Sequence, residues 1–304
     1  MQNHCPVCSD QKISRSFLYK SKSELLKSKS INICANCSLG YMKPMPSEQD
    51  WNNYNTEYFL NAHGGINRSK SMSFFKSAPA KLRFQYISHY QARNKLKFKR
   101  VFEVGPGEGQ MISVWKSYQA DIEYWVDESD TSVHKELLDL GAIILQKNEK
   151  LKNHKFDLVI MSHVLEHSID PVAFIKKATS QLKPGGLLFV EVPAEDYQYK
   201  DINEPHTLFF NKTSMAECLR RSGLKLKQCS LHGNTLISIK YFEIFRKVIS
   251  KLIEQLPKKL IKILLPKRLK NIMEVNEIIV SFPLAPYKCQ HSSGRWLRII
   301  AEKQ

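Results

Sequence analysis

The stretch Val101-Phe102-Glu103-Val104-Gly105-Pro106-Gly107-Glu108-Gly109-Gln110-Met111 decides the fold of this chain. A short apolar run ends in three alternating glycines, and a helical pattern follows it. This order predicts a strand, a tight turn and the start of a helix. Glycine permits a positive φ and lets a ligand come close to the backbone. The spacing is G-x-G-x-G, whereas a dinucleotide-binding turn would place its third glycine at Gln110. A plain structural turn is the alternative interpretation.

The composition describes a globular protein with a strong positive charge. The chain has 304 residues, of which 42% are hydrophobic, and its net charge is +17. It contains no uninterrupted apolar run of about 20 residues and its N-terminus has no apolar signal core, so we expect a cytoplasmic protein. The charge is compatible with nucleic acid, an anionic membrane or a phosphorylated substrate as the partner, and also with solvated surface lysines.

Two C-x-x-C pairs lie near the N-terminus, at Cys5 and Cys8 and at Cys34 and Cys37. Four thiolates from two tight turns close a tetrahedral zinc site, and four sulfur ligands leave no open position for catalysis. We therefore predict a structural zinc ion in a small ribbon over residues 1–46. A redox pair or two unrelated turns are the alternatives.

Residues 47–99 are interpreted as a connector with lid helices. Aromatic residues recur there at helical spacing, at Trp51, Tyr54 and Tyr58. Packing of the ribbon onto the next domain explains them, and the alternative is that Tyr54 or Tyr58 reaches into the substrate pocket. Residues 61–80 are rich in serine, glycine and asparagine, which predicts a loop or lid, and a helix is expected over 81–97.

Alternating strand and helix patterns follow the glycine turn, which predicts an α/β domain. A second strand ends at Asp127, where a carboxylate suits the two hydroxyls of a ribose. An apolar strand then breaks into the polar stretch Ser162-His163-Val164-Leu165-Glu166-His167. Open α/β sheets bind ligands at this carboxyl edge. Asp170-Pro171 suits the start of a helix, and a further strand is expected over 187–193.

These blocks, in this order, resemble class I S-adenosylmethionine (SAM)-dependent methyltransferases. The resemblance implies a Rossmann-like domain over 100–304 with a seven-stranded sheet, whose last strand, 296–301, is antiparallel. It also implies SAM as the cofactor. Glu103, Gly105, Gly107 and Gly109 would face its amino-acid part, Asp127 would bind its ribose, and Met161 and Ser162 would line its other side.

Three further features of the sequence indicate which class of molecule accepts the methyl group. The chain lacks the N-P-P-Y motif of enzymes that methylate exocyclic amines of bases, which disfavours that activity. The cysteine segment and the stretch Asn203-Glu204-Pro205-His206-Thr207-Leu208-Phe209-Phe210 resemble bacterial sugar and small-molecule methyltransferases with an N-terminal zinc-binding segment. Some of those act at carbon on nucleotide-linked deoxysugars. The resemblance implies carbohydrate biosynthesis, with a sugar, nucleotide-sugar or related small molecule as the substrate, methylated at oxygen or carbon.

The candidate general base is His206, oriented by Glu204, because histidine titrates near neutrality. In this chain Pro205 separates the two residues. His206 packing at the sheet edge is the structural alternative. His167 is a second catalytic candidate, with a structural hydrogen-bonding role as its alternative.

Residues 234–292 interrupt the domain before its last strand, with apolar residues at helical spacing and many lysines between them. This basic helical insertion is expected to form a lid or a dimer interface, in a monomer or homodimer, and contact of 241–270 with an anionic membrane is the alternative. Two rival functions stay open at this point: a zinc-ribbon RNA methyltransferase, and an adaptor that binds SAM without catalysis.

Overall fold

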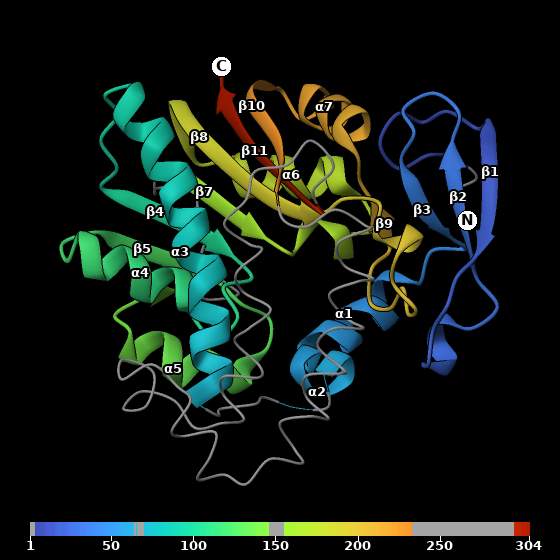
Figure 1. The fold of residues 1–304 in the computed structure, drawn as a ribbon, viewed down its shortest axis with the longest axis horizontal. Coiled ribbons are helices and arrows are strands. Elements are labelled where there is room, and N and C mark those ends of the chain that lie inside the picture. Colours follow the sequence, from blue (N-terminus) through green and yellow to red (C-terminus); the bar gives the residue numbers. More distant parts are fainter. Residues whose placement is uncertain (1–3, 64, 66–69, 146–154, 233–294) are drawn as a thin grey trace, which may run out of the picture.

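The chain folds around two β-sheets, which lie at opposite sides of Figure 1. The computed structural model describes residues 4–63, 65, 70–145, 155–232 and 295–304. The larger sheet has seven strands in the order β10-β11-β8-β7-β4-β5-β6. The smaller sheet has four, in the order β1-β2-β3-β9.

The seven-stranded sheet confirms the predicted fold. Its strands are β4 (Arg100–Val104), β5 (Glu123–Asp127), β6 (Ile143–Ile144), β7 (Phe156–Ser162), β8 (Leu182–Pro193), β10 (Leu224–His232) and β11 (Trp296–Lys303). Strands β4 to β8 pair in parallel, whereas β11 is antiparallel to both of its neighbours, β8 and β10. The last strand is therefore antiparallel, as the resemblance implied.

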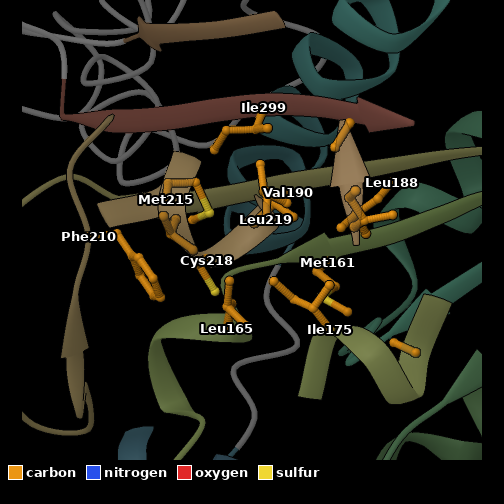
Figure 2. Packing of buried hydrophobic residues seen from close by; sticks show 14 of the residues in the cluster. Met161, Leu165, Ile175, Leu188, Val190, Phe210, Met215, Cys218, Leu219 and Ile299 are labelled. Atoms are coloured by element: carbon orange, nitrogen blue, oxygen red, sulfur yellow. The ribbon is translucent and has the colours of Figure 1, made fainter. Parts of the chain in front are cut away.

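Helices cover both faces of this sheet, as Figure 1 shows. They are α3 (Lys70–Arg93), α4 (Gln110–Tyr118), α5 (His134–Asp139), α6 (Pro171–Thr179) and α7 (Lys212–Arg221). One core cluster joins the sheet to α3, α4 and α5, and a second joins its other face to α6 and α7. Figure 2 shows the second cluster, in which Met161 of β7 and Val190 of β8 lie among Ile175, Met215 and Leu219 of the two helices.

The two helices on this second face begin at capping side chains, and α6 begins where Asp170-Pro171 predicted it. The Asp170 side chain accepts a hydrogen bond from the Ala173 backbone at 2.9 Å, and Pro171 is the first helical residue of α6. The Asn211 side chain accepts from the Ser214 backbone at 2.9 Å at the start of α7. These caps satisfy backbone N–H groups that the helix itself leaves unpaired.

The N-terminal sheet is completed by a strand from much later in the chain. It contains β1 (Ile13–Leu18), β2 (Ser30–Cys34), β3 (Gly40–Lys43) and β9 (Leu208–Phe209). The Met42 backbone N–H donates to the Thr207 carbonyl at 2.8 Å just before the β3–β9 pair begins. The cysteine-bearing segment is thereby hydrogen-bonded to the segment that carries His206.

Short helices fill the space between the two sheets and at the strand ends. They are α1 (Glu48–Thr56) and α2 (Tyr58–His63), with the 3-10 turns η1 (Glu24–Leu26), η2 (Thr131–Val133), η4 (Leu165–His167) and η5 (Asp196–Gln198). Trp51 and Tyr54 of α1 are buried and stack on each other, with ring centroids 5.0 Å apart. They belong to the core cluster of the N-terminal sheet, which is the packing role expected for them.

One expectation about the connector is wrong. Residues 61–80 were expected to form a loop or lid, but α2 extends to His63, and α3 begins at Lys70 and continues to Arg93. The buried residues Ala80, Phe84 and Ile87 lie on one helical face in the core, so packing extends the helix beyond the pattern seen in 81–97. The basic insertion at 234–292 lies outside the described residues. No helix in the described part of the chain is long and apolar enough to cross a membrane.

Candidate active site

A cavity opens at the carboxyl ends of β4, β5 and β7, the edge at which open α/β sheets bind ligands. Helices α1 and α2 contribute one residue each to its wall. The lining residues are Asn55, Tyr58, Val104, Gly105, Gly107, Asp127, Glu128, Ser129, His163, Val164, His167, Ser168 and Phe174. Tyr58 thus reaches the cavity, whereas Tyr54 is stacked on Trp51.

Two of the three glycines of the turn line this cavity. Gly105 and Gly107 have φ values of +64° and +57°, a region that side chains other than glycine rarely adopt. A Cβ atom on Gly105 would lie 2.6 Å from Cγ2 of Val164, so the turn and the cavity wall need a glycine here. Gly109 is outside the cavity and packs against Leu140, so its role is helix packing.

The acidic residues differ in position. Asp127 lines the cavity, as does its neighbour Glu128, which the sequence analysis did not single out. A Glu128 carboxylate oxygen accepts a hydrogen bond from the Gly107 backbone at 3.0 Å and so holds the glycine turn. Glu103 is not in the wall. It is buried behind the turn, where it accepts a hydrogen bond from the Tyr124 hydroxyl at 2.7 Å. Burial raises the pKa of Glu103 to about 7.

The structure does not place Met161 and Ser162 in the cavity wall. Met161 is fully buried in the core cluster beneath the sheet, as Figure 2 shows, and the Ser162 hydroxyl is buried without a hydrogen-bond partner among the described residues. Side chains alternate across a strand, and both faces of β7 are covered by helices. The wall is therefore formed by the residues after the strand, His163 and Val164.

The predicted pairing of Glu204 with His206 is wrong. The Glu204 carboxylate accepts hydrogen bonds from the Ser21 hydroxyl at 2.8 Å and from the backbone of Lys22 and Ser23 at 3.0 and 3.1 Å, so it ties this segment to the N-terminal sheet. The partner of His206 is Asp196, with 2.7 Å between Nδ1 and Oδ2. Nothing in the spacing of the two residues in the sequence indicates this contact, which η5 creates.

Asp196 and His206 form a buried hydrogen-bonded pair, and Lys200 extends it. The Lys200 ammonium lies 2.9 Å from the same Asp196 oxygen. Burial alone would raise the pKa of Asp196, but the His206 imidazole and the Lys200 ammonium together bring it below its ordinary range. Asp196 is therefore a carboxylate, which fixes the His206 Nδ1–H and leaves Nε2 as the acceptor nitrogen.

His167 stands between this pair and the cavity. Its ring centroid lies 5.0 Å from that of His206 and 5.6 Å from that of Tyr58, both edge-on. The His167 Nδ1 atom lies 3.3 Å from the Pro205 carbonyl, so Nδ1 carries the proton. Burial lowers the pKa of His167 to about 4, and a neutral imidazole therefore faces the cavity at neutral pH.

A buried charge network adjoins the cavity behind His163. Glu191 pairs with Arg83 at 2.6 Å and also with Arg298, and its Oε1 atom lies 3.2 Å from Nε2 of His163. His163 adopts a positive φ of 56°, which directs its ring back toward β8. This network could not be predicted from the sequence, because its members come from distant parts of the chain.

The four N-terminal cysteines converge at one end of the smaller sheet. All four are buried and free, and their sulfur atoms lie within 4.8 Å of one another. The Cys5–Cys37 and Cys8–Cys34 sulfur pairs are 3.5 and 3.4 Å apart. A tetrahedral ion with Zn–S bonds of about 2.3 Å separates its ligands by about 3.8 Å, so the cluster fits such an ion.

Comparison with known proteins gives the class. A family model described as a methyltransferase domain matches residues 48–228, and the chain belongs to this family. It is 32% identical over 120 residues to "Ubiquinone biosynthesis O-methyltransferase" of Histophilus somni (strain 2336), over 35% of this chain and 49% of that protein. A protein of the same name from Parvibaculum lavamentivorans is 49% identical over 35 residues, 12% of this chain and 14% of that protein. The chain thus spans at most half the length of these curated relatives.

Solved methyltransferase structures are similar to the chain at low sequence identity. A possible histamine N-methyltransferase from Thermotoga maritima is 18% identical, with a TM-score of 0.47 over 84% of this chain and all of that one. Coclaurine N-methyltransferase bound to N-methylheliamine and SAH is 12% identical, with a TM-score of 0.44 over 73% of this chain and 72% of that one.

Proposed function

We propose that this chain transfers a methyl group from SAM to a sugar, a nucleotide sugar or a related small molecule. The observation that carries the proposal is the cavity itself, whose wall joins the glycine turn and Asp127 on one side to His167 on the other. Membership of the methyltransferase family supports it. SAM supplies an electrophilic methyl group on a sulfonium.

The residues of the wall fit SAM in kind. Gly105 and Gly107 line the cavity without side chains, so the amino-acid part can approach their backbone, and Asp127 offers a carboxylate for the ribose hydroxyls. Gly109, Glu103, Met161 and Ser162 would support these groups from behind. We also infer a structural zinc ion held by the four cysteines, in a ribbon over 1–46 that precedes the methyltransferase domain.

Proton removal is assigned to His206, with Asp196 as its orienting partner in place of Glu204. Transfer to a hydroxyl forms a C–O bond, breaks the S–C bond and releases the hydroxyl proton. His206 Nε2 takes this proton, and the Asp196 carboxylate 2.7 Å from Nδ1 stabilises the resulting imidazolium. Because His167 lies at the wall and is neutral, we assign it to hold the acceptor hydroxyl.

A sugar-like acceptor is favoured by the rim of the cavity. Asn55 and Tyr58 present an amide and an aromatic ring there, a combination that suits a polyhydroxylated ring. The curated relatives are named ubiquinone biosynthesis O-methyltransferases, and this similarity supports methylation of a small molecule at oxygen. Methylation of an activated carbon uses the same base.

The acceptor class is tested with protein that carries zinc in its cysteine site and is free of excess metal, SAM labelled in its methyl group, and a cell extract separated into small anionic molecules and RNA. We expect label in the small anionic fraction, and none with Gly107→Arg, whose side chain fills the cavity. Label in RNA would instead assign the acceptor to nucleic acid. In that case activity should also fall steeply as salt is raised.

The base is tested by comparing His206→Gln with Glu204→Gln. We expect His206→Gln to lower kcat by about 10²- to 10⁴-fold while SAH binding is kept, because general-base catalysis contributes on that order. Glu204→Gln should retain most turnover, since Glu204 contacts the N-terminal segment. Equal kcat values for wild type and His206→Gln would remove His206 from the mechanism.

A further inference from the structure

Three buried or partly buried side chains meet beside the cavity, away from the cysteine cluster. They are Glu166 and His167 of η4 and His206 of the segment before β9. One ligand atom from each lies within 4.8 Å of the other two. Among the described residues, this is the one group besides the four cysteines that has the composition and spacing of a metal site.

Both histidines are already oriented as metal ligands are. His206 Nδ1 donates to the Asp196 carboxylate at 2.7 Å, and His167 Nδ1 donates to the Pro205 carbonyl at 3.3 Å. Each of these bonds fixes the tautomer and leaves Nε2 with a free lone pair. A carboxylate or carbonyl behind the imidazole is the usual outer partner of a metal-ligating histidine.

Glu166 supplies the independent observation. It is 1% exposed, and its Oε2 atom has no hydrogen-bond partner among the described residues. Its Oε1 atom lies 3.2 Å from Nδ1 of His163, which offsets the carboxylate charge only when that imidazole is protonated. A buried carboxylate in this condition is costly, and a bound cation is one of the few groups that satisfies it.

Two imidazoles and one carboxylate select a particular class of ion. Nitrogen ligands suit Zn²⁺, Co²⁺, Ni²⁺ or Fe²⁺, whereas Mg²⁺ and Ca²⁺ prefer oxygen ligands. Bonds of about 2.1 Å to such an ion would bring the three ligand atoms to about 3–3.5 Å of one another. Small side-chain rotations from the observed arrangement suffice.

We propose that Glu166, His167 and His206 form a divalent transition-metal site, and that an ion bound there inhibits methyl transfer. The inhibitory part rests on the proposed function, because the Nε2 lone pair that would take the acceptor proton is the one that the ion occupies. Methyl transfer then requires the site to be free of metal, and transition-metal availability sets the active fraction of the enzyme.

Binding is tested without any acceptor, by titrating Co²⁺ into full-length protein whose cysteine site has been filled with Zn²⁺. We expect one additional equivalent of Co²⁺ with the visible absorption of a nitrogen and oxygen site. Glu166→Gln and His206→Gln should weaken its Kd at least tenfold, and Asp196→Asn by 10- to 100-fold, the range for outer partners. Glu204→Gln is the matched control, because its carboxylate contacts other groups, and should bind as wild type does.

Inhibition is tested by adding Zn²⁺ to the methyl-transfer assay, with each variant compared with its own metal-free rate. We expect Zn²⁺ to inhibit the wild type and Glu204→Gln alike, and Glu166→Gln to need at least tenfold more. The metal site is refuted if no additional equivalent of Co²⁺ binds to the Zn²⁺-filled protein. It is also refuted if Glu166→Gln and His206→Gln bind Co²⁺ as the wild type does. In both cases the proposed function stands. If Co²⁺ binds and turnover is unchanged or rises, the inhibitory role is refuted. Failure to methylate sugars leaves the Co²⁺ titration unaffected and refutes the proposed function instead.

Discussion

At the scale of single residues, Glu103 shows how burial makes stability depend on pH. It is 2% exposed, and burial raises its pKa to about 7 even though the Tyr124 hydroxyl and the Arg83 charge favour the ionised form. In the unfolded chain a glutamate titrates at about 4.3. At lower pH both states are protonated. As the pH rises toward 7, the unfolded state loses its proton first, so the free energy of unfolding falls, by about 4 kcal/mol in all.

Glu103→Gln removes this titration and keeps an oxygen for the Tyr124 hydroxyl. We expect the stability of the wild type to fall relative to the variant by about 2 kcal/mol between about pH 5 and about pH 8. Urea unfolding of both proteins at the two pH values measures this difference. Parallel pH profiles would show that the Glu103 carboxyl titrates alike in the folded and unfolded states.

At the scale of elements, the turn between β4 and α4 requires glycine for two separable reasons. Gly105 and Gly185 both have positive φ values, +64° and +72°, so alanine at either position costs about 1–2 kcal/mol of backbone strain. A Cβ on Gly105 also meets Val164 at 2.6 Å in the cavity wall, whereas a Cβ on Gly185 meets nothing within 4 Å. We expect both alanine variants to lose stability, and Gly105→Ala alone to weaken SAH binding, at least tenfold by calorimetry. Equal SAH affinities of the two alanine variants would show that the contact of residue 105 with Val164 does not affect cofactor binding.

Regular elements were predictable because their periodicity is local. The strands that end at Val104, Asp127 and Ser162, and the helix capped by Asp170, follow from apolar spacing and cap residues. Strand β9 has only two residues and forms because it pairs with β3, so no local sequence pattern predicts it. The same holds for the site. The position of Asp127 in the cavity could be predicted from its place at the end of a strand. The contact between Asp196 and His206 could not, because it forms only in the tertiary structure. The burial of Met161 also could not, because it depends on the helices that cover both faces of the sheet.

At the scale of the whole molecule, hydrogen bonds and core packing connect the cysteine cluster to His206, the candidate base. Several hydrogen bonds hold the segment that carries His206 to the N-terminal segment, among them Asn203 N–H to Lys20 O at 2.8 Å, Tyr19 hydroxyl to His206 O at 3.0 Å, and Met42 N–H to Thr207 O at 2.8 Å. The buried cysteines also share a core cluster with Met215 and Leu219 of α7. The glycine turn and Asp127 belong to the other sheet. Loss of the inferred zinc ion should therefore disturb the acceptor side of the cavity more than the cofactor side.

Cys37→Ser tests this coupling, with Cys229→Ser as the control because Cys229 is half-buried and lies outside the cluster. We expect Cys37→Ser to lower Tm and kcat while SAH affinity changes less than about threefold, because metal binding is coupled to folding of the N-terminal segment, which contacts the His206 segment and α7. A folded Cys37→Ser protein with wild-type kcat would show that the N-terminal sheet does not hold His206 in place.

A chelator alone gives an ambiguous result. Removing the metal from the cysteine site should lower turnover, whereas removing it from the proposed site at Glu166, His167 and His206 should raise turnover. The two effects separate in Glu166→Gln, where a chelator should only lower the rate.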